Sequence, residues 1–173
     1  QAAIGPEKCA RFFDRFLLEF FGPGDATFIR SLGLNLVRLP VNYRHFEDDM
    51  EPLIIRESGL LRLDRVIDIC AAHGIYTIID LHALPGWENQ HWHSDNPTHV
   101  SLFWKHKHFQ DRVTHLWEVL ARRYRNNAWV AGYNLINEPA DPTEKMLMPV
   151  YRRLYEAIRT VDPDHILFLE GNR

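Results

Sequence analysis

The chain has 173 residues, of which 46% are hydrophobic and 12% aromatic, and its formal net charge is −3. This length and composition are typical of a single domain with one sizeable core. Charges of both signs are interspersed without the basic stripe of a nucleic-acid-binding protein, and no apolar run is long enough to span a bilayer. We therefore expect neither nucleic acid nor a membrane as a partner.

The N-terminal residues do not resemble a targeting segment. Residues 1–13 lack the basic region and the small-residue cleavage site of a signal peptide. The chain begins with Gln1 rather than Met, and we expect that the natural N-terminus is missing. Cys9 and Cys70 form no metal or redox motif, and Cys70 continues an apolar helical stripe that we expect to lie in the core. The localisation does not follow from these residues.

Apolar spacing and breaker residues predict helices and strands in alternation. In chain order these are a helix over 7–21, a short helix with Asp25 as N-cap and Gly33 at its end, a strand over 34–41, a helix over 63–74 with Gly74 as its C-terminal cap, a strand over 75–82, an irregular loop over 83–99, a helix over 109–124, a strand over 129–139, a helix over 147–158 and a strand over 165–172. The strands are nearly continuous apolar runs, as expected for a parallel sheet covered on both faces. Two architectures fit this alternation, a doubly wound open sheet and a (β/α)8 barrel.

Polar residues at the strand ends favour the barrel. They stand at or just past the C-terminal end of every predicted strand: Arg38 with Asn42, Asp80 with His82, Asn137 with Glu138, and Glu170 with Asn172. A doubly wound nucleotide-binding protein would carry a glycine-rich turn after its first strand, and no strand here leads into one. Polar groups gathered from several strand ends mark the active face of a barrel. We therefore predict an α/β fold in which about four α/β units form part of a (β/α)8 TIM barrel.

The segment Asn137-Glu138-Pro139 ends the third predicted strand with a carboxylate. A residue before proline is pushed towards extended geometry, so we predict that Glu138 keeps strand conformation and is aimed by the sheet. A rigidly aimed carboxyl group suits a general acid. The alternatives are that Glu138 caps the next segment or pairs with an arginine, and these three residues leave both interpretations open.

Three segments, 32–43, 75–82 and 132–139, together resemble the consecutive strand motifs of glycoside hydrolase family 5, the cellulase family of clan A. The resemblance extends from the first helix to Asn172, and the visible strands match the family's second to fifth. It implies a (β/α)8 barrel and an O-glycosyl hydrolase that acts on a β-linked oligo- or polysaccharide with retention of configuration.

The resemblance also implies roles for individual residues. Glu138 matches the general acid/base, Asn137 the asparagine that binds the sugar 2-hydroxyl, and Arg38 the arginine that helps to keep the nucleophile ionised. An arginine inside an apolar strand needs a carboxylate partner in any case, so a purely structural ion pair is the alternative for Arg38. His82 matches the histidine that lines the sugar site, with a hydrogen-bonded core histidine as the alternative. Asp80 is expected to orient a neighbouring side chain and not to act in catalysis itself.

The loop after the second predicted strand carries several aromatic residues. Flat aromatic faces stack on sugar rings, so Trp87 and Trp92 are predicted to bind substrate, together with Asn42 from the first strand end. A loop folded on its own aromatic side chains is the alternative for both tryptophans, and we expect Trp104 to be buried. The substrate stays open among β-1,4-glucan, β-1,3-glucan, mannan and glycolipid heads, as does endo or exo action.

Two other functions remain as alternatives. A metal-dependent TIM-barrel hydrolase would use His91-x-His93 or His106-x-His108, but neither pair lies on a predicted strand, where ligands are held rigidly. We therefore expect no metal and no cofactor. The second alternative is a carbohydrate-binding remnant without catalysis.

Residues 1–173 do not account for the whole family pattern. A retaining glycosidase needs a second carboxylate roughly 5 Å from the first, and the family places this nucleophile on its seventh strand, outside the chain. Glu170 is expected to contact substrate or to support the structure. We interpret the chain as one incomplete catalytic domain, with a helix and loop over 1–24 and consecutive α/β units over 25–173. Its open sheet edges are expected to promote self-association, and the isolated chain is expected to be inactive.

Overall fold

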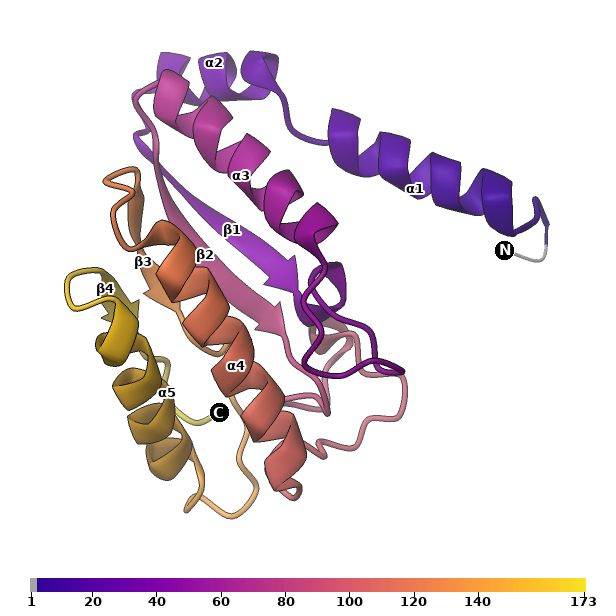
Figure 1. The fold of residues 1–173 in the computed structure, drawn as a ribbon, viewed down its shortest axis with the longest axis vertical. Helices are drawn as coiled ribbons and strands as arrows, with labels where there is room; N and C mark the ends of the chain where they lie inside the picture. The colour runs from indigo at the N-terminus through magenta and orange to yellow at the C-terminus, as the bar shows by residue number, and fades with distance from the viewer. Residues whose placement is uncertain (1–2) are drawn as a thin grey trace.

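The structure is a computed structural model that describes residues 3–173 (Figure 1). Its elements in chain order are α1 (Pro6–Glu19), α2 (Pro23–Ser31), β1 (Leu36–Asn42), α3 (Glu57–Ala72), β2 (Tyr76–Ala83), α4 (Lys107–Tyr124), β3 (Val130–Asn134), α5 (Leu147–Val161) and β4 (Ile166–Phe168). Short 3-10 turns follow β1 at Tyr43–His45 and interrupt the loop after β2 at Trp92–Ser94. Within the described range, no helix combines the length and the apolar character needed to cross a membrane.

The strands form one parallel sheet in the order β1-β2-β3-β4. Each strand pairs with the next strand along the chain, so residues 3–173 contain no point where the strand order reverses, as it does in a doubly wound sheet. Helices α3, α4 and α5 all lie on one face of the sheet (Figure 1). Because the helices of a barrel all lie outside its strands, this arrangement confirms the prediction of an α/β fold that forms part of a barrel.

The outer face of the sheet packs against these helices and forms the main core. Ile79 and Leu81 of β2 and Tyr133 of β3 are fully buried there. Trp117 of α4 lies against the Tyr133 ring, with 5.5 Å between the ring centroids, and its indole N–H donates to the Leu135 carbonyl at 3.0 Å. Large aromatic side chains dominate the energetics of such a core, so these contacts fix α4 on the sheet.

The inner face of the sheet carries apolar residues at one end and polar residues at the other. At the N-terminal end, Leu36, Tyr76 and Ile166 are 47%, 43% and 57% exposed. Near the C-terminal end, Asp80 and Asn134 are paired in the register of β2 and β3, and both are buried. The interior of a complete barrel is filled by side chains from eight strands, whereas four strands supply them here.

The start of α2 differs from the sequence prediction. The helix begins at Pro23 with Gly22 as its N-cap, so the prediction of Asp25 as N-cap is wrong. Proline fits the first turn of a helix because it lacks an N–H that would have no partner there, and Asp25 instead accepts a hydrogen bond from the Gly22 N–H at 2.8 Å. The predicted caps at Gly33 and Gly74 are confirmed, with φ angles of 80° and 67°.

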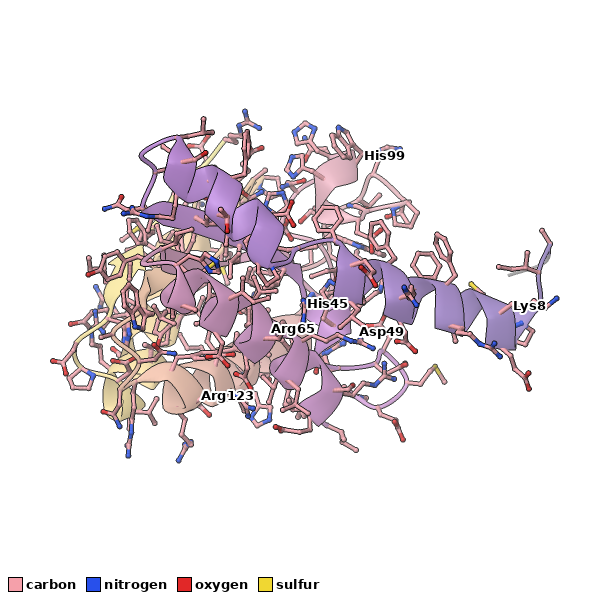
Figure 2. All side chains as sticks on the ribbon, turned by 90° about the horizontal axis from the view of Figure 1, so that it is seen from above. Lys8, His45, Asp49, Arg65, His99 and Arg123 are labelled. Atoms are coloured by element: carbon pink, nitrogen blue, oxygen red, sulfur yellow. The ribbon has the colours of Figure 1, made fainter. Side chains whose placement is uncertain are left out.

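Helix α1 stands apart from the packed part of the chain. None of its residues is buried, and Phe12, Phe13 and Phe16 are 57%, 55% and 46% exposed. An ion pair of 2.5 Å joins Asp14 to Arg62 of α3. Figure 2 shows α1 projecting beyond the other helices, with Lys8 near its far end. The predicted helix is therefore present, but no other segment of residues 3–173 covers its apolar face. In contrast, Cys70 of α3 is fully buried, as its helical spacing predicted.

Candidate active site

Side chains from three strands meet at the Asp80 carboxylate, which is fully buried near the end of β2. Its Oδ1 accepts a hydrogen bond from Asn134 Nδ2 at 3.0 Å and lies 3.0 Å from Arg38 Nη2. Its Oδ2 lies 2.7 Å from His82 Nδ1. A buried charge needs such partners, and here they allow one carboxylate to orient three side chains.

Arg38 connects Asp80 to two residues from other segments. Its Nη2 donates to Asn137 Oδ1 at 2.6 Å and to Glu170 Oε1 at 3.2 Å. The Arg38 side chain remains 41% exposed, and it lines a pocket of about 290 Å³ together with Asn134 and Glu170. The expectation that an arginine in this strand has a carboxylate partner is therefore confirmed.

Glu170 lies just past β4 and contacts both Arg38 and Asn134. Its Oε1 also accepts a hydrogen bond from Asn134 Nδ2 at 2.6 Å, and its Oε2 accepts one from the Glu138 backbone N–H at 2.9 Å. The Tyr151 hydroxyl of α5 donates to the Glu170 carbonyl at 3.0 Å and accepts from the Glu170 N–H at 3.1 Å. Because donors occupy both carboxylate oxygens, the geometry favours the supporting role among the two that the sequence left open.

Glu138 is not in strand conformation, so that prediction is wrong. Strand β3 ends at Asn134, and the Glu138 backbone is left-handed, with φ of 45°. Tertiary hydrogen bonds hold the peptide groups on both sides of this residue: Glu170 accepts from its N–H, and Asn89 Nδ2 donates to its carbonyl at 3.0 Å. These contacts outweigh the extended geometry that Pro139 favours in the preceding residue.

The Glu138 carboxylate lies beside two side chains that the sequence does not connect to it. His93 Nε2 lies 3.1 Å from Glu138 Oε2, and the Arg173 guanidinium forms an ion pair with the same oxygen. The Glu138 side chain is 32% exposed, so a ligand can still reach it. The alternative prediction that Glu138 pairs with an arginine is therefore confirmed by its ion pair with Arg173. The sequence places His93 in the aromatic loop after the second predicted strand and in a possible metal-binding pair, and no spacing signal connects it to Glu138.

His82 lies beside His93, with 5.7 Å between the ring centroids. Its Nδ1 faces the Asp80 carboxylate, so this nitrogen carries a proton, and Nε2 points away from Asp80. The His82 side chain is 30% exposed, and is therefore not enclosed in the core. The structure thus brings His82 to the same edge of the sheet as Arg38, Asn137 and Glu138.

The other predicted substrate-binding residues lie further from Glu138. Asn42 Nδ2 donates to Asp95 Oδ2 at 3.2 Å, on the neighbouring loop. Trp92 is 84% exposed, and its ring centroid lies 6.0 Å from that of His93, so it stands at the edge of the cluster. Trp104 is 4% exposed, which confirms its expected burial.

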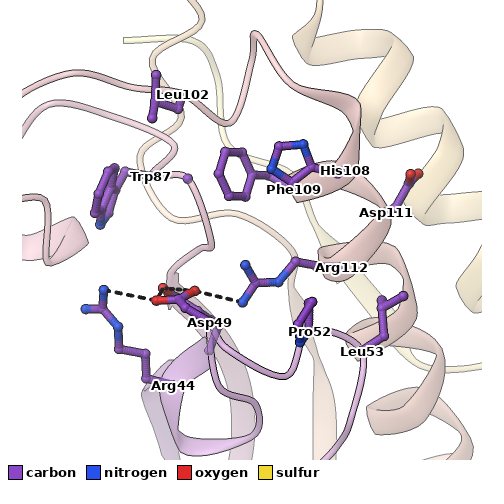
Figure 3. A pocket seen from close by; sticks show the side chains of 12 residues that line it. Arg44, Asp49, Pro52, Leu53, Trp87, Leu102, His108, Phe109, Asp111 and Arg112 are labelled. Atoms are coloured by element: carbon purple, nitrogen blue, oxygen red, sulfur yellow. Dashed lines mark hydrogen bonds and ion pairs between the residues drawn. The ribbon is translucent and has the colours of Figure 1, made fainter.

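Trp87 lines a separate pocket of about 520 Å³ between the loop after β1 and the start of α4 (Figure 3). Figure 3 shows Asp49 between two arginines, with Arg112 Nη2 at 2.9 Å and Arg44 Nη2 at 3.5 Å. Burial raises the pKa of the Asp49 carboxyl, but hydrogen bonds from Arg112 and Tyr43 lower it more, so the net shift is downward. The charges of this larger pocket are thus already paired. We place the candidate site at Glu138 because an accessible carboxylate lies there among strand-end residues.

The histidine pairs do not converge as metal ligands would. The rings of His91 and His93 stack, with 5.6 Å between centroids and 17° between planes, and those of His106 and His108 lie 5.7 Å apart. Among residues 3–173, no group of three or more His, Cys, Asp and Glu side chains is arranged to hold a metal ion.

Comparison with known proteins identifies the family. Residues 24–173 match the family described as Cellulase (glycosyl hydrolase family 5). The chain belongs to glycosyl hydrolase family 5. One relative of this family 5 chain is the protein named Beta-xylosidase from Phanerodontia chrysosporium, which is 59% identical over 169 residues, or 98% of this chain and 36% of that protein. Endoglucanase C from Acetivibrio thermocellus is 28% identical over 160 residues, or 92% of this chain and 44% of its own length.

A solved structure of a relative shows the same fold. A crystal structure described as that of a glycoside hydrolase matches the family 5 chain with a TM-score of 0.75 and 26% identity, and covers 87% of this chain and 46% of that one. The chain therefore spans between about a third and a half of the length of these relatives. Its four parallel strands correspond to part of a glycosyl hydrolase family 5 barrel.

Proposed function

We propose that the full-length protein is a glycoside hydrolase that cleaves β-glycosidic bonds with retention of configuration, with Glu138 as general acid/base. The observation that carries this proposal is the position of Glu138, whose side chain is 32% exposed at the C-terminal edge of a parallel sheet while His93 and Arg173 bind one of its oxygens. Barrel enzymes carry their active sites at this edge. A fixed and accessible carboxyl group there suits protonation of the leaving oxygen and later activation of water.

In this proposal, Asn137 and Arg38 prepare the sugar and the nucleophile. Arg38 holds Asn137 Oδ1 at 2.6 Å, and one N–H of the amide faces His93 Nδ1 at 3.5 Å. The second N–H is available to donate to the sugar 2-hydroxyl, a contact that strengthens in the transition state. The Arg38 cation also favours the ionised form of a nearby carboxylate nucleophile. Glu170 is a poor candidate for this nucleophile because both of its oxygens accept hydrogen bonds. We place the nucleophile outside residues 1–173.

The relatives suggest which sugars to test first. A β-xyloside comes first because the relative named Beta-xylosidase is 59% identical, and a β-glucan comes second because Endoglucanase C is 28% identical. Trp92, which is 84% exposed beside the cluster, is available to stack on a sugar ring in either case. Xylose lacks the hydroxymethyl group that glucose carries at C5, so paired aryl β-xylosides and β-glucosides distinguish the two substrates.

The test is hydrolysis by the full-length protein and its Glu138→Gln variant. We expect the variant to lose about 10²–10⁴-fold in kcat/KM on substrates with poor leaving groups, because their first step needs a proton from the enzyme. Activated aryl glycosides need little acid assistance and should lose much less in kcat/KM. Glu156→Gln, an exposed change on α5, is the matched control and should behave as the unmodified protein does. Equal losses on both kinds of substrate, or an inverted anomeric product, would contradict the proposal.

A further inference from the structure

The two oxygens of the Glu138 carboxylate lie in different environments. Among residues 3–173, every hydrogen bond and ion pair of this carboxylate involves Oε2, which accepts a hydrogen bond from the Arg173 guanidinium and lies 3.1 Å from His93 Nε2. Oε1 has no such donor within these residues. A proton on Oε2 would compete with the Arg173 donor and would face the His93 ring nitrogen 3.1 Å away, so the proton of the acid form belongs on Oε1.

The contacts on the other side of His93 determine which of its nitrogens carries a proton. Arg38 can only donate, so the Asn137 amide must turn its oxygen towards Arg38, at 2.6 Å. The amide nitrogen then faces His93 Nδ1 at 3.5 Å, at the outer limit of a hydrogen bond. Since this amide nitrogen is a donor, Nδ1 must be the acceptor, and the proton of the neutral ring lies on Nε2, towards Glu138. The relay thus runs from Arg38 through Asn137 and His93 to Glu138.

The surroundings of His93 keep its ring neutral. Partial burial lowers the pKa of His93, the Glu138 carboxylate raises it, and His82, His91 and Arg173 lower it again, with a net downward shift. These groups come from every segment packed against the ring: β2, its own loop, the segment after β3, and the C-terminal residue. A neutral imidazole places Nε2 3.1 Å from Glu138 Oε2 without adding a second full positive charge to that of Arg173.

We propose that His93 is a positioning residue that binds Glu138 Oε2 and thereby makes Oε1 the oxygen that exchanges the catalytic proton. This inference rests on the proposed glycoside hydrolase function. In the first step, the proton leaves Oε1 for the glycosidic oxygen as the bond from that oxygen to the anomeric carbon breaks and a carboxylate nucleophile bonds to the carbon. In the second step, Oε1 takes a proton from the water that displaces the nucleophile. Throughout both steps His93 keeps its own proton on Nε2.

Two substitutions of His93 in the full-length protein test the role of the Nε2 donor. A glutamine side chain can place an N–H close to the position of Nε2, whereas leucine has similar bulk and no donor. We expect His93→Leu to lose about 10–100-fold in kcat/KM on poor-leaving-group substrates and much less on activated aryl glycosides, and its pH–rate profile to lose the alkaline limb at a higher pH, because the carboxylate has lost a donor. His93→Gln should retain most of the activity. His106→Leu, an exposed histidine at the start of α4, is the matched control.

Three outcomes would overturn the inference. The first is a His93→Leu variant that matches the unmodified protein in leaving-group dependence and pH profile. The second is a His93→Gln variant as impaired as His93→Leu. The third is independent of turnover: imidazole ¹⁵N NMR of the full-length protein near neutral pH should show the Nε2–H tautomer of His93, and the Nδ1–H tautomer would contradict the relay even if His93→Leu does not fold. These outcomes differ from a failure of the proposed hydrolase function, in which the unmodified protein itself would hydrolyse no β-glycoside.

Discussion

The two ends of the inner sheet face are built from the same strands but carry different kinds of side chains. At the C-terminal end, Arg38, Asp80 and Asn134 form hydrogen bonds and ion pairs between strands. At the N-terminal end, Leu36 and Tyr76, paired in the register of β1 and β2, form no such network and remain about half exposed, at 47% and 43%. Hydrogen bonds and ion pairs between strands are thus confined to the edge at which barrels carry their active sites. The opposite edge carries apolar side chains and depends on their packing.

The largest expected effect concerns the apolar end in the isolated chain of residues 1–173. Exposed apolar side chains and two open sheet edges favour association, so we expect an oligomer or aggregate in size-exclusion chromatography. Tyr76→Lys combined with Ile166→Lys should shift the elution towards the monomer. The isolated chain should also be inactive, because a lone general acid contributes typically about 10²–10⁴-fold, whereas enzymes reach at least about 10⁶-fold. A monodisperse monomer with retaining glycosidase activity would contradict both expectations.

The second prediction concerns the stability of the polar end in the full-length protein. Asp80→Ala removes the buried carboxylate that Arg38 and Asn134 share, but Arg38 stays 41% exposed and keeps Glu170 as a partner, so we expect a loss of about 1.5–3 kcal/mol, typical of hydrogen bonds to a charged group. Urea unfolding should show this loss as a lower midpoint. Asp68→Ala, an exposed change on α3, should stay within about 0.5 kcal/mol of the unmodified protein. A loss below about 1 kcal/mol for Asp80→Ala would mean that the network does not stabilise this edge.

The third prediction separates catalysis from binding at the same end. In the full-length protein, Asn137→Ala removes the amide that we place on the sugar 2-hydroxyl, and this contact is tightest in the transition state. We expect kcat to fall about 10–100-fold while KM changes by less than about threefold. Steady-state kinetics on an aryl β-xyloside would measure both constants, with the exposed Asn126→Ala as the control. A rise in KM at unchanged kcat would instead make Asn137 a ground-state binding residue.

The smallest expected effect compares a tryptophan from each end of the sheet. Trp92, which is 84% exposed beside His93, should contribute stacking of about 0.5–1.5 kcal/mol, so Trp92→Ala should raise KM about twofold to tenfold. Trp129 is 37% exposed at the start of β3, where its ring lies 5.1 Å from Tyr76, and Trp129→Ala should leave KM unchanged. If both variants raise KM equally, the effect comes from general destabilisation and not from contact with the sugar.

Much of the fold follows from signals that are local in the sequence. The apolar spacing through Cys70, followed by Gly74 and the run that becomes β2, needs only neighbouring residues to predict a helix, its cap and a strand. The start of α2 was missed because two signals competed, and the proline at its first position outweighed Asp25 as a cap. The separation of α1 from the core could not be predicted, because its apolar face looks like that of a packed helix.

The candidate site was predictable where the sheet itself places the side chains. Arg38 and His82 lie within β1 and β2, so their places near the C-terminal ends of neighbouring parallel strands suffice to bring them to one edge of the sheet. His93 and Arg173 were missed because a loop and the last residue reach Glu138 through tertiary contacts alone. The backbone of Glu138 was mispredicted for the same reason, since Glu170 and Asn89 hold its peptide groups from other segments.

The left-handed backbone of Glu138 has an evolutionary consequence. A non-glycine residue in this region costs about 1–2 kcal/mol, a penalty that glycine avoids. Selection for folding alone would therefore favour Glu138→Gly, which relaxes the backbone and removes the carboxylate. Because most proteins lie only just above the stability they need, a lineage released from catalysis would drift towards such replacements at this position. In the proposed function this backbone strain is tolerated because glycine cannot supply the general acid.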